Sequence, residues 1–110
     1  MRKLVIIPTY NELENMKLLL PELMNLKSEF DVLIADDSSP DKTADFVLEF
    51  QKTNPRVNLL LRQQKNGLGQ AYIAGFKWGL EHNYDVLVEM DADFSHRPED
   101  LVKILKAIES

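Results

Sequence analysis

The sequence predicts an α/β domain of the Rossmann-like, doubly wound type, in which helices cover both faces of a parallel sheet. Four short apolar runs alternate along the chain with four segments of helical periodicity, in the order β-α-β-α-β-α-β-α. The apolar runs are continuous, which is typical of strands buried on both faces. A length of 110 residues suits one domain, and we expect the strand order 3-2-1-4.

The first strand is expected over 4–7, LVII, and is followed by Pro8. A helix is expected over 12–26, because Met16 and the leucines recur there at spacings of three and four. Pro21 lies inside this helix, where a proline costs about 3 kcal/mol. We therefore expect either a kink or two short helical pieces.

The next two strands are expected over 31–35, DVLIA, and 57–61, VNLLL. The segment between them begins with turn and helix-capping residues. A helix is expected to start there at Asp41 or Thr43 and to run to about Lys52.

The third helix is expected over 70–82. Ala71, Gly75 and Gly79 lie on or near one of its faces, and such small residues let a helix approach a sheet closely. The fourth strand follows in the stretch YDVLVEMDADFSH. Pro98 is well placed at the first position of the last helix.

Charge and composition argue against several classes of protein. The net charge of −5 and the scattered lysines and arginines do not predict a nucleic-acid partner. The chain has no cysteine, and the four apolar residues before Pro8 are too few for a signal peptide. No segment approaches the roughly 20 apolar residues of a membrane span. We therefore expect the cytoplasm or the cytoplasmic face of a membrane.

Asp91 and Asp93 lie one residue apart where the fourth strand ends. Mg²⁺ and Mn²⁺ bind through one or two carboxylates and leave their other positions to water and substrate phosphates. Nine aspartates in 110 residues make such a pair common by chance, and the alternative is that both only cap a helix and solvate a loop. The location carries the argument, because strands one, two and four all end in polar clusters at the edge where doubly wound sheets bind ligands.

The glycines and aromatic residues point away from two familiar nucleotide motifs. Gly67 and Gly69 follow the third strand and lack the third glycine of a dinucleotide-binding fingerprint, and no GxxxxGK[ST] loop occurs. After the first strand, Tyr10 offers a ring that can stack on a base and Glu12 offers an acceptor. The alternative for Tyr10 is an amphipathic surface residue.

Four ordered motifs resemble those of family 2 glycosyltransferases of the GT-A type, and look closest to dolichol-phosphate or polyprenol-phosphate mannose synthases. The motifs are VIIPTYNELENM, VLIADDSSPDKTA, NGLGQAYIAGFKWGL and VLVEMDADFSHRPEDL. The resemblance implies that the chain is the nucleotide-binding half of a GT-A fold, with Pro8, Tyr10 and Glu12 lining the nucleoside pocket. It also implies that Asp37, with Asp36 beside it, hydrogen-bonds the base or ribose.

The same resemblance implies roles for residues after the third and fourth strands. Asp91 would lie near the ribose and the metal, and Asp93 would be the main ligand of Mg²⁺ or Mn²⁺, so both are expected to be catalytic. Ser95 would complete the metal shell, although a role in the turn that enters the helix is an equal alternative. Gly67 and Gly69 would shape a loop near the sugar nucleotide, or would only terminate structure.

The activity that the resemblance implies is metal-dependent, inverting transfer of mannose from GDP-mannose to a polyprenyl or dolichyl phosphate. GDP-glucose and UDP-glucose stay open as donors. Relatives continue beyond these motifs with acceptor contacts, so we expect the donor-binding half of a transferase domain, with weak or no activity alone, peripheral membrane contact and a homo-oligomer. The alternatives are a receiver-type phosphoacceptor domain, in which VLIADDSS and VLVEMDAD would be acidic strand ends, and a non-catalytic nucleotide-binding remnant.

Overall fold

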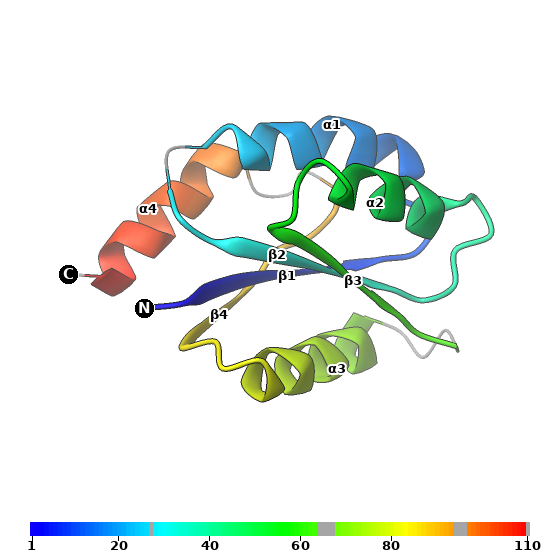
Figure 1. Ribbon diagram of the computed structural model, residues 1–110. Coiled ribbons are helices and arrows are strands. Elements are labelled where there is room, and N and C mark those ends of the chain that lie inside the picture. Colours follow the sequence, from blue (N-terminus) through cyan, green and yellow to red (C-terminus); the bar gives the residue numbers. More distant parts are fainter. Residues whose placement is uncertain (27, 64–67, 94–96, 110) are drawn as a thin grey trace.

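The computed structural model describes residues 1–26, 28–63, 68–93 and 97–109, and it confirms the predicted alternation of strands and helices (Figure 1). The four strands form one parallel sheet in the order β3-β2-β1-β4, as the sequence predicts. In chain order the elements are β1 (Lys3–Thr9), α1 (Leu13–Met24), β2 (Asp31–Asp36), α2 (Thr43–Gln51), β3 (Val57–Leu61), α3 (Leu68–Glu81), β4 (Val86–Glu89) and α4 (Pro98–Glu109).

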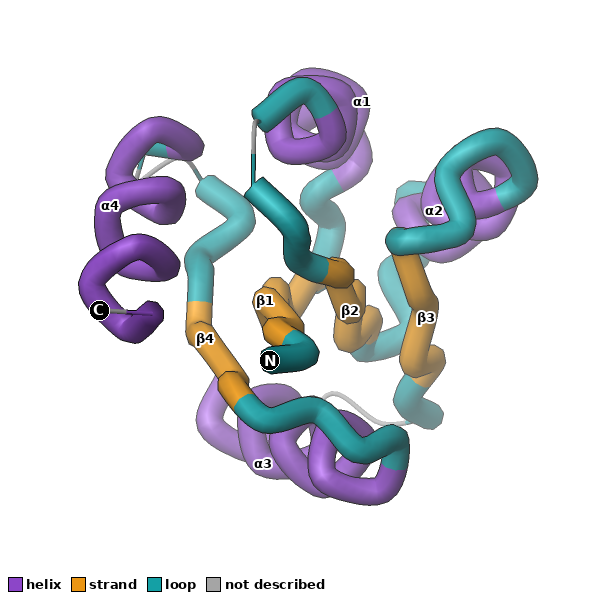
Figure 2. The backbone as a smooth tube through the Cα atoms, turned by 60° about the vertical axis from the view of Figure 1, so that its left-hand side comes forward, coloured by secondary structure: helices purple, strands orange, loops and turns teal. Residues whose placement is uncertain are grey.

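Helices cover both faces of the sheet, which confirms the doubly wound architecture. α1, α2 and α4 lie on one side and α3 lies alone on the other (Figures 1 and 2). The larger core lies under α1, where Val5 and Ile7 of β1 meet α1 and α4. The smaller core lies over α3, where Leu4 and Ile6 point the other way. β1 is buried along its whole length between the two cores.

β1 runs two residues further than predicted and continues through Pro8 to Thr9. The reason is that alternate residues of β1 direct their backbone hydrogen bonds toward β4 on one side and toward β2 on the other. Ile6 accepts a hydrogen bond from the Met90 amide at 3.0 Å, and β4 pairs with β1 only as far as Ile6. Pro8 has the same parity as Ile6, so its missing N–H faces the side on which β4 has already ended. The strand therefore loses no ladder bond at the proline.

α1 runs through Pro21 as one helix, so the expectation of two helical pieces is wrong. Pro21 lies in the last turn of α1, and only the carbonyl four residues earlier, that of Lys17, loses its partner. Lys17 is exposed, so water can reach this carbonyl. The helix ends at Met24, two residues before the predicted end.

α3 packs closely against the sheet through the two glycines predicted for this purpose. A Cβ added at Gly75 would lie 2.6 Å from Cγ2 of Ile6, and one added at Gly79 would lie 2.6 Å from Cδ2 of Leu87. No real side chain tolerates such distances without a shift. The glycines therefore set the separation of α3 from β1 and β4.

Tyr84 closes the amino end of the sheet, away from the predicted site. Its hydroxyl donates to Oδ2 of Asp31 at 2.5 Å, and the guanidinium of Arg2 lies 4.2 Å from the centre of its ring. Burial, the hydrogen bond to Asp31 and the charge of Asp31 raise the pKa of Tyr84 to about 12. The phenol therefore stays a neutral donor at neutral pH.

The strand order excludes the receiver-type alternative. A receiver that began near Asp31 would pair β2 directly with β4, because in the 2-1-3-4-5 order the first strand lies between the second and third. In this sheet β1 lies between β2 and β4. None of the helices in the described part of the chain is long and apolar enough to cross a membrane.

We predict that Gly75→Ala lowers the free energy of unfolding by about 1–3 kcal/mol, because its methyl group must displace Ile6 or lift α3 from the sheet. Gly69→Ala is the matched control, since an added Cβ there has nothing within 4 Å. At Gly69 alanine should be neutral or stabilising, as in an exposed helical position. Urea unfolding measures both, and equal effects would show that α3 is not held at this depth by Gly75.

Candidate functional site

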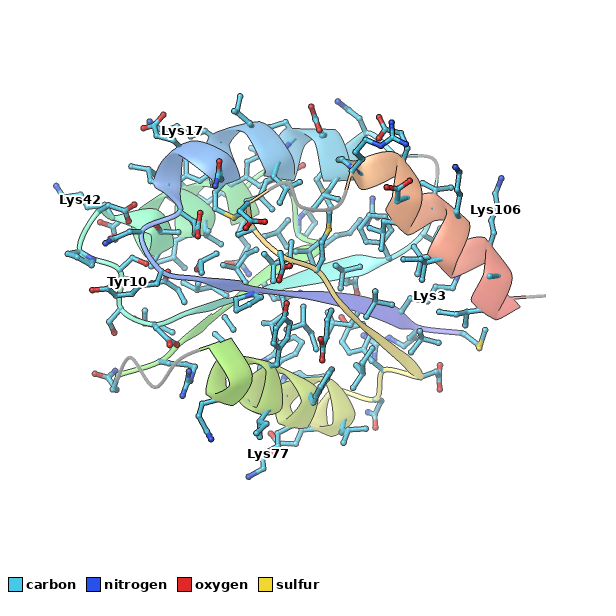
Figure 3. All side chains as sticks on the ribbon, turned by 180° about the vertical axis from the view of Figure 1, so that it is seen from behind. Lys3, Tyr10, Lys17, Lys42, Lys77 and Lys106 are labelled. Atoms are coloured by element: carbon cyan, nitrogen blue, oxygen red, sulfur yellow. The ribbon has the colours of Figure 1, made fainter. Side chains whose placement is uncertain are left out.

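The polar loops that follow β1, β2 and β4 meet at the carboxyl end of the sheet. Lys3 and Tyr10 mark the two ends of β1 in Figure 3, with Tyr10 on the side of the site. The strand order places the switch point between β1 and β4, because the chain proceeds from β1 through β2 to β3 and then crosses the sheet through α3 to β4 on the other side of β1. The predicted residues of the first, second and fourth loops therefore belong to one edge of the molecule.

The loop after β1 is hydrogen-bonded to the loop after β2. The Asn11 amide donates to Oγ of Ser39 at 2.8 Å, and the Glu12 amide donates to Oγ1 of Thr43 at 3.2 Å. Asn11 has a φ of 56° and Ser38 also has a φ of 56°, a left-handed conformation that non-glycine residues adopt rarely. These bonds hold the two loops as one unit.

Asp41 joins the starts of α1 and α2. Its Oδ2 accepts from the amide of Leu13 at 3.1 Å and its Oδ1 accepts from the amide of Thr43 at 3.0 Å. Burial alone would raise the pKa of Asp41, but the bonds from Thr43 and Leu13 outweigh it and hold the pKa below its ordinary value of 3.8. Asp41 therefore accepts from the first amide of each helix, although Lys42 occupies the N-cap position of α2.

Asp36 is fully buried at the end of β2, and both its oxygens are engaged by the protein. Oδ1 accepts from Oγ1 of Thr9 and from Oγ of Ser39, each at 2.6 Å, and Oδ2 accepts from the Ser39 amide at 2.9 Å. A buried carboxylate needs such partners to offset the cost of desolvation. The contact of Asp36 with a base or ribose stays a prediction, and its visible task is to hold the loop.

Asp37 is buried beside Asp36 and forms an ion pair with Arg62. Nη1 of Arg62 lies 2.7 Å from Oδ1 of Asp37, and the side chain of Arg62 is only 14% exposed. The Arg62 amide also donates to the carbonyl of Asp36 at 2.7 Å. The sequence pattern did not indicate Arg62, although this residue directly follows β3, and β3 lies beside β2, the strand that ends just before Asp37.

A pocket of about 120 Å³ brings the first and fourth loops together. It is lined by Pro8, Glu12, Asp91, Ala92 and Asp93. Three acidic residues thus line one small volume, and the described residues of this lining include no lysine or arginine. Asp93 is exposed and Asp91 is half-buried. Tyr10, Asp36 and Asp37 lie outside this lining.

Tyr72 of α3 is a second residue that the sequence pattern did not indicate. Its hydroxyl donates to Oδ1 of Asp91 at 3.0 Å. Burial, this hydrogen bond and the negative charges of Asp91, Glu89 and Asp93 raise the pKa of Tyr72 well above its ordinary value. The hydroxyl therefore keeps its proton and stays a donor to Asp91.

Some predicted residues fall outside the described part of the chain. Ser95 and Gly67 are not among the described residues, so their predicted roles are untested. Gly69 is described and lies in the first turn of α3, because this helix begins at Leu68, two residues before the predicted start at residue 70. Its predicted role near a sugar nucleotide stays a prediction.

The acidic pair fits a hard divalent cation. In the described residues, no group of three or more His, Cys, Asp or Glu side chains is arranged to hold a metal ion. Mg²⁺ and Mn²⁺ do not require such a cage, because one or two carboxylates suffice when substrate phosphates supply other ligands. Asp91 and Asp93 line one pocket and provide oxygen ligands of this kind.

Comparison with known proteins identifies the relatives of the chain. The family model described as glycosyl transferase family 2 matches residues 4–110. The chain is 56% identical over 108 residues to the undecaprenyl-phosphate mannosyltransferase of Micrococcus luteus, covering 98% of this chain and 44% of that protein. It is 48% identical over 110 residues to the polyprenol monophosphomannose synthase of Mycolicibacterium smegmatis, covering 99% of this chain and 42% of that protein.

A solved structure gives a matching fold. The mannosyltransferase PcManGT from Pyrobaculum calidifontis, in complex with GDP-Man and Mn²⁺, matches with a TM-score of 0.78 and 26% identity. The match covers 96% of this chain and 31% of that one. The chain therefore spans less than half the length of each of these three relatives.

We predict that Asp41→Ala lowers the free energy of unfolding by about 1–2 kcal/mol at pH 7, because two helices lose a capping acceptor. The depressed pKa means that the contribution of Asp41 is present above pH 3.8 and is lost as the pH falls through the folded-state pKa. The variant should therefore lose stability less steeply than the wild type in acid. Urea unfolding at pH 7 and across the acid range measures both effects.

Asp45→Ala is the control for this prediction, because Asp45 is exposed in the first turn of α2 and lacks the bonds that Asp41 makes. It should cost about 0.3 kcal/mol through the helix dipole. Equal losses for the two variants would show that Asp41 does not join the helices energetically.

Proposed function

We propose, from the fact that this chain belongs to glycosyl transferase family 2, that it takes part in transfer of mannose from GDP-mannose to a polyprenyl or dolichyl phosphate. The observation that carries the proposal is the pocket in which Asp91 and Asp93 after β4 meet Pro8 and Glu12 after β1. Ligands of doubly wound sheets bind at this switch point. The names of the two mannosyltransferase relatives from bacteria support the choice of sugar and acceptor class.

The nucleoside would bind along the loops after β1 and β2. We assign Pro8, Tyr10 and Glu12 to the walls of its pocket, with the Tyr10 ring available to stack on the base. Asp37 would accept a hydrogen bond from the base or ribose, and Asp36 would hold the loop that presents it. The ion pair with Arg62 supports this assignment, because it fixes the orientation of Asp37.

The diphosphate would lie over the acidic pair. We assign Asp91 and Asp93 as ligands of Mg²⁺ or Mn²⁺, with Ser95 as a further ligand, and the complex of PcManGT with GDP-Man and Mn²⁺ supports this choice. A cation bound there would offset the charge that develops on the departing diphosphate. The carboxylates of Asp91 and Asp93 would hold this cation, and with it the positive charge, close to the reacting anomeric carbon.

The proposed reaction needs little base catalysis. The acceptor phosphate is already an anion at neutral pH, so its oxygen can attack the anomeric carbon without losing a proton to the protein. The new carbon–oxygen bond forms as the bond to the diphosphate breaks, which inverts the configuration at that carbon and releases GDP. The chain must therefore chiefly orient the donor and exclude water.

We further propose that these 110 residues form the donor-binding part of the transferase domain. Peripheral contact with the cytoplasmic face of a membrane, and association with another copy, belong to the same proposal. A lipid-linked acceptor supports the membrane contact, since its phosphate lies at a membrane surface.

A second candidate function is that of a non-catalytic module, which binds the nucleotide sugar without turnover.

We predict that Asp93→Ala abolishes metal-dependent binding of GDP-mannose, a loss larger than the 10–100-fold that typically follows removal of a partner of a metal ligand. Calorimetry with Mn²⁺ and with Mg²⁺ measures the affinity, and GDP-glucose and UDP-glucose test the donor. Asp93 is exposed, so its removal should leave the fold intact. Asp45→Ala is the matched control and should bind as the wild type does. An Asp93→Ala variant with normal metal-dependent affinity would contradict the assignment.

We predict weak or no transfer of radiolabelled mannose to a polyprenyl phosphate by the 110 residues alone. A full-length hybrid, in which these 110 residues replace the corresponding part of a relative, should both bind GDP-mannose and transfer mannose. Strong turnover by the 110 residues alone would overturn the donor-binding assignment. Absence of turnover in the full-length hybrid, with intact donor binding, would favour the non-catalytic module.

A further inference from the structure

We propose that Tyr72 is a positioning residue for the metal site. Its uncharged hydroxyl fixes the orientation of the Asp91 carboxylate by donating a hydrogen bond to it. The inference rests on the proposed function, because it takes Asp91 as a ligand of the divalent cation. It goes beyond that function in assigning a task to α3, an element that contributes no residue to the lining of the pocket.

The contact itself is specific. The Tyr72 hydroxyl donates to Oδ1 of Asp91 at 3.0 Å, from an element 19 residues earlier in the chain. Among the described residues, no other side chain is seen to bond this carboxylate. An ionised carboxylate has about four acceptor positions on its two oxygens. One donor therefore orients Asp91 and leaves positions for a cation.

The position of the hydroxyl is set by packing on two sides. The Tyr72 ring lies against Phe76, with ring centres 6.4 Å apart, and both rings pack on the smaller core. One turn further along α3, Gly75 allows the helix to approach Ile6 so closely that a Cβ would lie 2.6 Å from its Cγ2. The depth of α3 thus determines how far beyond the end of β4 the hydroxyl reaches.

The chemistry of a phenol suits this position. A lysine or arginine bonded to Asp91 would cancel part of the negative charge that attracts the cation. A tyrosine hydroxyl orients the oxygen and leaves the full charge in the pocket, beside Asp93 and Glu12. Partners of this kind typically change metal affinity by about 10–100-fold.

The test compares Tyr72→Phe with Tyr84→Phe, which removes the same hydroxyl from a tyrosine bonded to a different aspartate at the other end of the sheet. Calorimetry of GDP-mannose binding in the presence of Mn²⁺ should show an affinity about 10-fold lower for Tyr72→Phe. Tyr84→Phe should bind as the wild type does. Without metal, in EDTA, Tyr72→Phe and the wild type should be equal.

A second readout does not require Tyr72→Phe to fold. With fluorotyrosine incorporated, the ¹⁹F resonance of Tyr72 should shift when Mg²⁺ and GDP are added, while that of Tyr84 should stay. Phenylalanine variants of the other two tyrosines assign the three signals. A Tyr72 signal that does not respond overturns the inference, whether or not Tyr72→Phe folds.

The outcomes separate the inference from the proposed function. If the wild type binds GDP-mannose with Mn²⁺ and Tyr72→Phe binds it with equal affinity, the role of Tyr72 is overturned and the proposed function stands. Wild type that binds no nucleotide sugar with either metal overturns the proposed function and the inference together. A loss seen equally in Tyr84→Phe would show a general loss of stability and also overturns the inference.

Discussion

The unequal pairing of β1 with its two neighbours is the constraint on which the site depends. β2 accompanies β1 as far as Thr9, whereas β4 stops at Ile6. The carboxyl edge of the sheet is therefore uneven, with a step where β1 and β2 extend beyond the end of β4. The chain after β4 turns beside Pro8, where a further strand residue would otherwise lie. Pro8 cannot donate a hydrogen bond on that side, so the step leaves no orphaned amide. The acidic pair occupies this step, next to the loop of β1.

The carboxylates at this edge divide into two groups by their partners. Asp36, Asp37 and Asp41 accept hydrogen bonds or an ion pair from the protein and hold the loops after β1 and β2. Asp91, which accepts from Tyr72, and Asp93 line the pocket. The cost of burying charge explains the first group best at Asp36 and Asp37, which are buried and need protein partners, whereas Asp91 is half-buried and Asp93 is exposed. Sequence proximity to a strand end does not distinguish the two groups, and only burial and bonding do.

The fold was predictable from sequence because parallel buried strands have continuous apolar runs, and β3 begins and ends where the pattern indicated. The pattern placed the end of β1 too early, because it treated Pro8 as the end of the strand. The sequence does not show that Pro8 faces the side of β1 on which β4 has already ended, where no hydrogen bond is lost. The location of Asp91 and Asp93 beside Pro8 and Glu12 was predictable from their position after the fourth strand. Tyr72 and Arg62 were not, because their partners lie 19 and 25 residues away and are reached only through the packed sheet.

α3 connects the packing of the sheet to the chemistry of the pocket. Gly75 and Tyr72 lie one turn apart on this helix, and the first sets its depth while the second bonds Asp91. A displacement of the helix would therefore move the donor of Asp91 even though no residue of the pocket lining changed. O–H···O hydrogen bonds span donor–acceptor distances of about 2.5–3.0 Å, so the Tyr72–Asp91 contact of 3.0 Å is at the long end of this range and has little tolerance for such a movement. The close approach permitted by two glycines is thus as much a requirement of the proposed metal site as of the smaller core.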